Sequence, residues 1–117
     1  LKTDTEGLDY GVLKGMGSLN AEVVVAEFWQ PDFVFNQHRS DNTLENIASV
    51  LVEHDIPWFI VLYRGFNNMF VGCSTQSLDV PSTSWGNVIG FRDHALYSRA
   101  VEWCHENLGR FQHVQNN

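Results

Sequence analysis

The chain has 117 residues, of which 44% are hydrophobic and 13% aromatic, a composition typical of one globular domain and not of a disordered or fibrous chain. The formal net charge is −7 and only seven residues are Lys or Arg, so the sequence lacks the clustered cations that bind nucleic acid or an anionic membrane surface. No apolar run approaches the roughly 18 residues of a membrane-spanning helix, and we expect neither nucleic acid nor membrane as a partner.

The first part of the chain shows a strand–helix–strand pattern. Residues 1–4 have the pattern of a strand end, and residues 8–19 carry apolar side chains at helical spacing. Residues 22–28 are β-branched and almost continuously apolar, which is typical of a strand buried on both faces in a parallel sheet. Such a unit is expected to have a right-handed crossover.

A second helix is predicted after a polar loop. Asn42 and Glu45 have the spacing of a capping box, in which the Asn42 side chain accepts a hydrogen bond from the Glu45 N–H. The Glu45 side chain reaches back to the Asn42 N–H in the same motif. The helix is expected to end near residue 54, before Ile56-Pro57.

The rest of the chain predicts a hairpin, a strand and a helix. Residues 58–63 are strongly apolar, and a turn at 65–68 allows 69–73 to return as the second strand of a hairpin. Residues 86–91 predict another strand, and Asp93 can cap a last amphipathic helix.

Together these elements predict a single α/β domain over residues 1–109, with a frayed tail at 110–117. The expected sheet is mainly parallel, with an antiparallel element near the carboxyl end and helices on its faces. The two cysteines, Cys73 and Cys104, form no CxxC pair, and we expect reduced thiols in a cytoplasmic protein. A disulfide between them is the alternative.

Two carboxylates near the amino end are the first candidate site residues. Asp4 and Glu6 are two positions apart in an extended segment, so their side chains point to the same side, and Gly7 permits a tight turn after them. Chemistry in open α/β proteins lies beyond the carboxyl ends of the strands. Asp4 and Glu6 are therefore candidates for positioning a substrate or for deprotonating a hydroxyl nucleophile. The alternative is that Asp4 caps the next helix and Glu6 is solvated.

A third carboxylate, Glu27, follows four apolar strand residues, where an unpaired charge is costly. We expect Glu27 to face Asp4 and Glu6 across adjacent strand ends. The alternative is a salt bridge, or hydrogen bonds to the backbone of a loop.

His38 lies in the loop after that strand and is the candidate acid–base residue, with a surface position as the alternative. Oxygen and nitrogen ligands for a metal ion could come from Asp32, His38 and Asp41 together with Glu27. Their spacing matches no metal motif, and no metal is predicted.

Three stretches agree in order and spacing with motifs of one enzyme family. The segment Leu1-Lys2-Thr3-Asp4-Thr5-Glu6-Gly7 is followed by Val12-Leu13-Lys14-Gly15, the strand Val-Val-Val-Ala-Glu ends at Glu27, and a late strand carries Gly86-Asn87. This combination resembles the FkbM-type S-adenosylmethionine-dependent methyltransferases over about residues 1–91.

The resemblance implies a Rossmann-like methyltransferase sheet, in which residues 1–4 are the fourth strand and 22–28 the fifth. It implies methyl transfer from S-adenosylmethionine, commonly to a hydroxyl of a sugar or natural product. Asp4 would then contribute to cofactor binding, and Asp4, Glu6, Glu27 and His38 to catalysis. The family's glycine-rich S-adenosylmethionine loop precedes the segment matching residue 1. The chain is therefore expected to be the carboxyl-terminal part of such an enzyme, and whether it acts as an enzyme alone is left open.

A second hypothesis is a non-catalytic α/β binding or self-assembly module derived from such an enzyme. The strand at residues 1–4 would expose an apolar edge, and an uncovered edge pairs readily with another copy. This hypothesis predicts a homo-oligomer with no affinity for the methyl donor. A third hypothesis, a small hydrolase, needs a nucleophile–base pair, and no GxSxG motif is present to supply the nucleophile.

Overall fold

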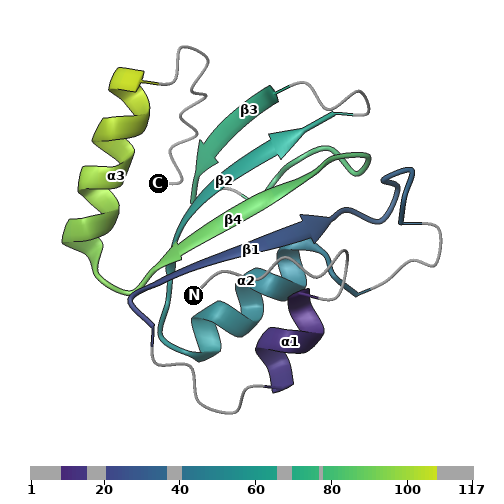
Figure 1. The fold of residues 1–117 in the computed structure, drawn as a ribbon, viewed down its shortest axis with the longest axis horizontal. Coiled ribbons are helices and arrows are strands. Elements are labelled where there is room, and N and C mark those ends of the chain that lie inside the picture. Colours follow the sequence, from purple (N-terminus) through teal and green to yellow (C-terminus); the bar gives the residue numbers. More distant parts are fainter. Residues whose placement is uncertain (1–8, 16–20, 37–40, 66–69, 77, 108–117) are drawn as a thin grey trace.

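The computed structural model describes residues 9–15, 21–36, 41–65, 70–76 and 78–107 (Figure 1). The elements in chain order are α1 (Asp9–Gly15), β1 (Val23–Trp29), α2 (Leu44–Glu53), β2 (Trp58–Arg64), β3 (Phe70–Thr75), β4 (Trp85–Phe91) and α3 (His94–Asn107). None of the helices in the described ranges has both the length and the apolar character needed to cross a bilayer.

The four strands form one sheet in the order β1-β4-β2-β3, and all neighbouring strands are antiparallel (Figure 1). Because β4 pairs with both β1 and β2, these two strands run in the same direction on either side of it. The connection from β1 to β2 passes through α2, which makes a split strand–helix–strand unit. The carboxyl ends of β1 and β2 therefore lie at the same edge of the sheet.

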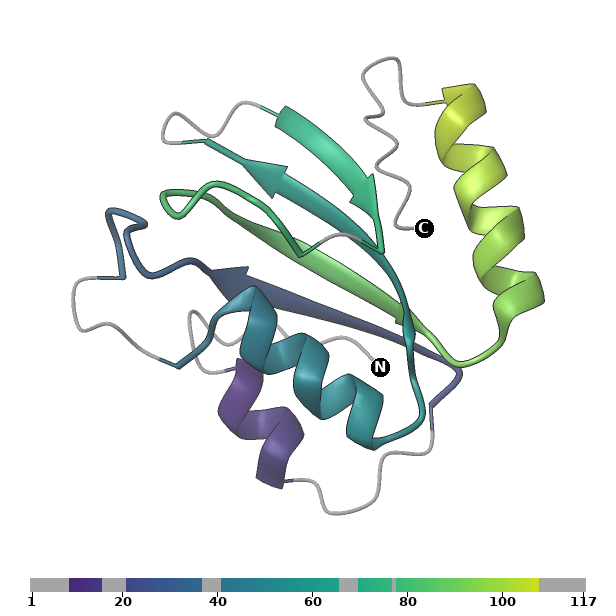
Figure 2. The same ribbon diagram turned by 180° about the vertical axis from the view of Figure 1, so that it is seen from behind.

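The prediction of a mainly parallel, Rossmann-like sheet is wrong. The sheet is antiparallel, with helices on both of its sides (Figures 1 and 2). The apolar run at residues 22–28 indicated burial on both faces, but in β1 the side chains of Val24, Ala26 and Phe28 are buried toward α1 and α2, whereas those of Val23, Val25 and Trp29 on the other face are half-buried. Burial does not specify the direction of the neighbouring strand. Here the neighbour is β4, which comes from the far end of the chain and runs opposite to β1.

The core has one layer on each side of the sheet. Among the described elements, α1 and α2 pack on one face of the sheet and α3 packs on the other (Figure 2). The first layer contains Leu13, Val24, Ala26, Phe28, Leu44, Ile47, Ala48, Val50, Leu51, Ile56, Phe59, Val61, Tyr63 and Val88. The second is smaller and is built around Ile60, Phe91, Tyr97 and Cys104.

The cap of α2 differs from the prediction. Thr43 is the N-cap residue, and its hydroxyl accepts from the Asn46 N–H at 3.3 Å. Asn42 is fully buried and its side chain bonds to β1 and α1 instead. Asn42 and Thr43 are both residue types that cap helices. Buried backbone groups of β1 and α1 need hydrogen-bond partners, and the side chain of Asn42 supplies them, so that Thr43 caps the helix.

The hairpin and the last helix are confirmed. β2 and β3 pair directly. At the end of the hairpin opposite the turn, the side chain of Gln76 accepts a hydrogen bond from the Phe59 N–H and donates one to the Pro57 carbonyl. Asp93 caps α3, because its carboxylate accepts from the Ala95 N–H at 3.1 Å.

Candidate functional site

The face of the sheet toward α3 is organised in rows, each with one side chain from β1, β4 and β2. Register and the alternation of side chains along a strand determine the rows. They are Val23–Phe91–Trp58, Val25–Ile89–Ile60, Glu27–Asn87–Leu62 and Trp29–Trp85–Arg64. The rows change from apolar to polar and aromatic toward the carboxyl ends of β1 and β2.

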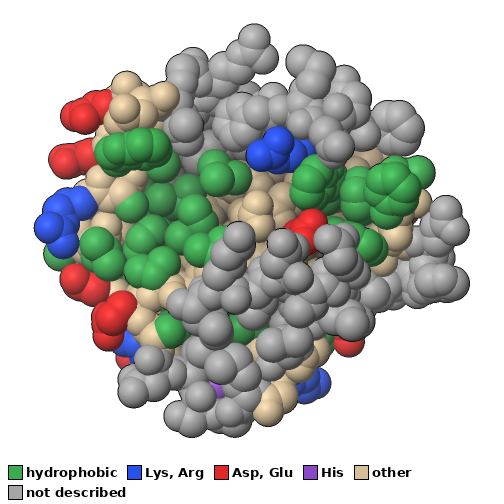
Figure 3. Space-filling view, viewed as in Figure 1, with side chains coloured by type: hydrophobic (Ala, Val, Ile, Leu, Met, Phe, Trp, Pro, Cys, Tyr) green, Lys and Arg blue, Asp and Glu red, His purple; other side chains and the backbone are tan. Residues whose placement is uncertain are grey.

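The change is visible on the surface. Figure 3 shows hydrophobic side chains in two groups on this face, one beside α3 and one at the far end of the strands, with acidic and basic side chains between them. The third and fourth rows supply a carboxylate, an amide, two indoles and a guanidinium. These are groups that hydrogen-bond to and stack on a ligand.

Glu27 is the buried carboxylate of this region, with 9% of its surface exposed. Its Oε1 atom accepts from Trp29 Nε1 at 3.3 Å, within the same strand. Asn87 lies directly opposite Glu27 on β4. The carboxylate is therefore held on the α3 side of the sheet with an amide as its cross-strand neighbour.

Asn42 fixes the backbone around Glu27. Its Nδ2 donates to the Glu27 carbonyl at 3.0 Å, and its backbone oxygen accepts from the Trp29 N–H at 2.9 Å. Its Oδ1 accepts from the Tyr10 N–H at 2.6 Å. Asn42 thus satisfies two backbone groups on the outer edge of β1, as a neighbouring strand would. It also joins the first turn of α1 to the carboxyl end of β1.

Four aromatic side chains, Trp29, Phe33, Phe35 and Trp85, form what we call the aromatic rim. Phe33 stacks on Trp85 with centroids 5.9 Å apart and meets Trp29 edge-on at 5.6 Å. Phe35 packs edge-on against Phe33 and is 71% exposed. The Arg64 guanidinium lies 5.7 Å from the Trp85 ring, within the range of a cation–π contact.

The indole nitrogen of Trp85 is a buried donor without a hydrogen-bond partner, the one such side-chain atom found in the described ranges. Buried donors are nearly always paired, so an orphaned one needs an explanation. A ligand oxygen is one group that would satisfy it.

The loop that carries Phe33 and Phe35 is fixed by Asn36. This buried amide donates to the carbonyl oxygens of Trp29 and Gln30, at 3.3 and 3.1 Å. The Phe33 N–H in turn donates to the Gln30 carbonyl. The aromatic rim therefore has a defined backbone beneath it.

Gly86 explains how Asn87 reaches its position. A Cβ atom at residue 86 would overlap the carbonyl oxygen of Leu62 on β2. Glycine is therefore needed where β4 crosses this part of β2, and the next residue, Asn87, is placed beside Glu27.

Of the predicted site residues, Asp4, Glu6 and His38 lie outside the described residues, and so does Gly7. Glu27 is described, at the carboxyl end of β1 as the sequence indicated. Asp32 and Asp41 are both exposed. Among the described side chains, no three His, Cys, Asp or Glu residues gather as metal ligands would.

The sequence reasoning missed Asn42, Arg64 and the aromatic rim as parts of this region. The capping box assigned Asn42 to the start of the helix instead. The signal that brings these residues together is the register of β1 and β2 on β4. Comparisons with protein-family models, with curated proteins and with solved structures found no match.

Proposed function

We propose that this chain forms the acceptor-binding part of an S-adenosylmethionine-dependent O-methyltransferase, with a sugar or similar polyhydroxylated compound as the acceptor. The observation that carries the proposal is the buried carboxylate of Glu27 beside Asn87, bordered by the aromatic rim. Carboxylate and amide groups hydrogen-bond to hydroxyls, and aromatic rings pack against the C–H faces of a sugar ring.

Glu27 has the central role in this proposal. Its carboxylate accepts a hydrogen bond from the acceptor hydroxyl and takes the proton as the oxygen becomes a nucleophile. Trp29 Nε1 bonds to one carboxylate oxygen and fixes its orientation. Asn87 orients a second hydroxyl, and Asp4, Glu6 and His38 remain proposed catalytic residues, with Asp4 also proposed to contact the cofactor.

The methyl donor is assigned to a part of the enzyme other than the described residues. S-adenosylmethionine supplies the methyl group when it is bound, and in the family that the sequence resembles it is held by a glycine-rich turn after a strand. The 117 residues contain no GxGxxG sequence, and the described strand ends carry no such turn. We therefore assign the described residues to the acceptor and not to the donor.

Calorimetric titration of the chain with methyl β-glycosides of common hexoses tests acceptor binding. We expect at least one glycoside to bind, and Glu27→Gln to weaken it by at least about tenfold, because a hydrogen bond to a charged acceptor is replaced by a weaker one to a neutral amide. Glu22→Gln is the matched control, since Glu22 is exposed just before the same strand. Equal affinities of the two variants would contradict the role of Glu27.

A non-catalytic binding or self-assembly module is the second candidate. The lack of a GxGxxG sequence favours it, because the same acceptor surface could serve binding alone. Titration with S-adenosylmethionine and light scattering together test the module. Micromolar binding by this chain would contradict the module, whereas no binding together with a stable oligomer in light scattering would contradict catalysis by the chain alone.

We also propose a cytoplasmic location. Cys104 carries a thiol that is buried against β2 and β4, and thiols stay reduced in the cytoplasm. Fractionation of the source cells with an antibody against the chain tests this location, and recovery in a secreted fraction would contradict it.

A further inference from the structure

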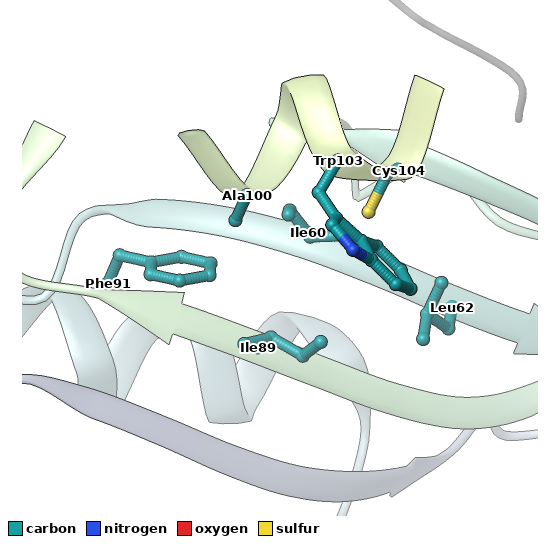
Figure 4. Close-up of a pocket in the computed structure, with 7 residues that line it drawn as sticks. All are labelled: Ile60, Leu62, Ile89, Phe91, Ala100, Trp103 and Cys104. Carbon is teal, nitrogen blue, oxygen red and sulfur yellow. The ribbon is translucent and has the colours of Figure 1, made fainter. Parts of the chain in front are cut away.

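An apolar cavity of about 310 Å3 lies between α3 and the sheet (Figure 4). Its lining comes from β2, β4 and α3 and consists of Ile60, Leu62, Ile89, Phe91, Ala100, Trp103 and Cys104. Every lining side chain is a hydrocarbon, an indole or a thiol. The cavity is open to solvent on one side, and its lining favours an apolar group over water.

The cavity exists because α3 packs closely on the sheet near its first turn and then presents a small side chain. Tyr97 stacks on Trp58 at 5.6 Å and meets Phe91 at 5.9 Å, which fills the space near the start of the helix. One turn later, Ala100 contributes only a methyl group above Ile60 (Figure 4). Trp103, 58% exposed, projects from α3 toward the sheet and also lines the cavity (Figure 4).

The volume indicates the size of the group that fits. It is about twice the ~150 Å3 of an engineered apolar cavity that binds benzene. A fused bicyclic ring or a medium-length alkyl chain has the matching size and chemistry. A charged group is disfavoured, because the lining offers no partner for it.

The cavity ends where the polar rows begin. Leu62, which lines it, belongs to the same row as Asn87 and Glu27, and Ile60 and Ile89 form the row before. The cavity and the Glu27 carboxylate therefore lie on one face of the sheet, about one row apart. A single ligand with an apolar part and a hydroxylated part can occupy both.

From this arrangement we infer that the acceptor is amphipathic, such as an aryl or alkyl glycoside. Its apolar group binds between α3 and the sheet, and its hydroxyls lie at Glu27 and Asn87. The inference rests on the proposed function for the hydroxylated part only. The apolar site depends on the cavity alone.

Two probes test the two parts separately. 2-Naphthol serves as the apolar probe, and the 2-naphthyl β-glycosides of glucose, galactose and mannose serve as amphipathic probes. Titrations of the full chain are followed by NMR with labelled Ile and Leu methyl groups. We expect 2-naphthol to show intermolecular contacts to the methyls of Ile60, Leu62 and Ile89, and at least one glycoside to bind more tightly than 2-naphthol.

Ala100→Leu fills the cavity and is expected to weaken 2-naphthol binding by at least about tenfold, because the leucine occupies the volume that the ring needs. Ala95→Leu makes the same change on the exposed side of α3 and should leave binding unaltered. The methyl contacts in the unsubstituted chain test the site even if Ala100→Leu fails to fold.

The outcomes separate the two parts. No contact between 2-naphthol and these methyls, or equal binding by the two leucine variants, would overturn the cavity site even if simple methyl glycosides bind at Glu27. If 2-naphthol binds but no glycoside gains affinity, and Glu27→Gln changes nothing, the amphipathic acceptor is overturned together with the proposed function. The apolar site then stands by itself.

Discussion

The side-chain nitrogen of Asn42 donates to the backbone carbonyl of Glu27 at 3.0 Å, although the two residues are 15 positions apart in the sequence. The other end of the same amide accepts from the Tyr10 N–H. One buried side chain therefore links α1 to the carboxyl end of β1. The position of Glu27 depends on a residue that belongs to neither of these elements.

Asn42→Ala should lower the free energy of unfolding by about 2–3 kcal/mol, because it leaves a buried acceptor and a partly buried donor without partners. Urea unfolding followed by circular dichroism measures the loss. Asn46→Ala is the control, since the side chain of Asn46 donates to the Asp41 carbonyl at an exposed position where water can replace it. A similar loss in both variants would show that Asn42 does not have this linking role.

Asp55 follows the carboxyl end of α2 with φ of 62°, in the left-handed region. The Ile56 N–H bonds to the Leu51 carbonyl around it, which is the closing bond of a Schellman-type cap. Asp55→Gly should raise the free energy of unfolding by about 0.5–1 kcal/mol, because glycine adopts this φ without the Cβ clash.

Gln76 provides the comparison, since its φ is 61°. Its side chain bonds to the backbone of Phe59 and Pro57, so Gln76→Gly should be destabilising despite the same relief of φ. Thermal denaturation should show a higher midpoint temperature for Asp55→Gly and a lower one for Gln76→Gly. Equal shifts in one direction would mean that backbone conformation, and not the side-chain bonds, decides the effect at both positions.

Gly86→Ala should be severely destabilising, by at least about 2 kcal/mol, because the added methyl overlaps backbone atoms of Leu62 and Tyr63 that are held in the sheet. Gly11→Ala is the opposite case. Nothing lies within 4 Å of a Cβ at Gly11, and alanine there should stabilise α1 by up to about 1 kcal/mol. Urea midpoints of the two variants are expected to move in opposite directions, and a tolerated alanine at residue 86 would refute the close crossing of β4 and β2.

The strands and helices of the described part could be predicted from apolar spacing, but their order in the sheet could not. The run around Val24 and Phe28 specifies a buried strand, and it carries no information about which strand lies beside it or in which direction. β4 is distant in the chain and enters between β1 and β2. The pairing of β4 with β1 and β2 depends on contacts between residues far apart in the chain, and a local sequence pattern does not predict such contacts.

The same limit applies to the candidate site. Glu27 could be identified because a carboxylate in an apolar strand is costly unless it is paired. Arg64 and Trp85 could not be placed near it, because they reach the fourth row only through the register of two strands on β4. Asn42 had a plausible local role as a cap, and the buried carbonyl of Glu27 competed for its side chain more strongly.

Trp29 and Trp85 are neighbours in one row, and their indole nitrogens differ in one respect. Trp29 Nε1 bonds to Glu27, whereas Trp85 Nε1 is buried without a partner within the described part of the chain. Trp→Phe removes similar ring area at both positions, so the comparison isolates the N–H group. Trp29→Phe should cost about 1 kcal/mol more in unfolding free energy than Trp85→Phe, because only the former breaks a hydrogen bond.

For Trp85, the loss of the N–H group should appear in the affinity for the glycoside. We expect Trp85→Phe to weaken glycoside binding by roughly fivefold or more, since its N–H would donate to an oxygen of the glycoside and a neutral hydrogen bond contributes about 1 kcal/mol. Calorimetric titration with the glycoside that binds the unsubstituted chain measures the affinity, and urea unfolding measures the stability. Unchanged binding by Trp85→Phe would exclude its N–H as a ligand contact, and the orphaned donor would then be only a cost of stacking Trp85 on Phe33.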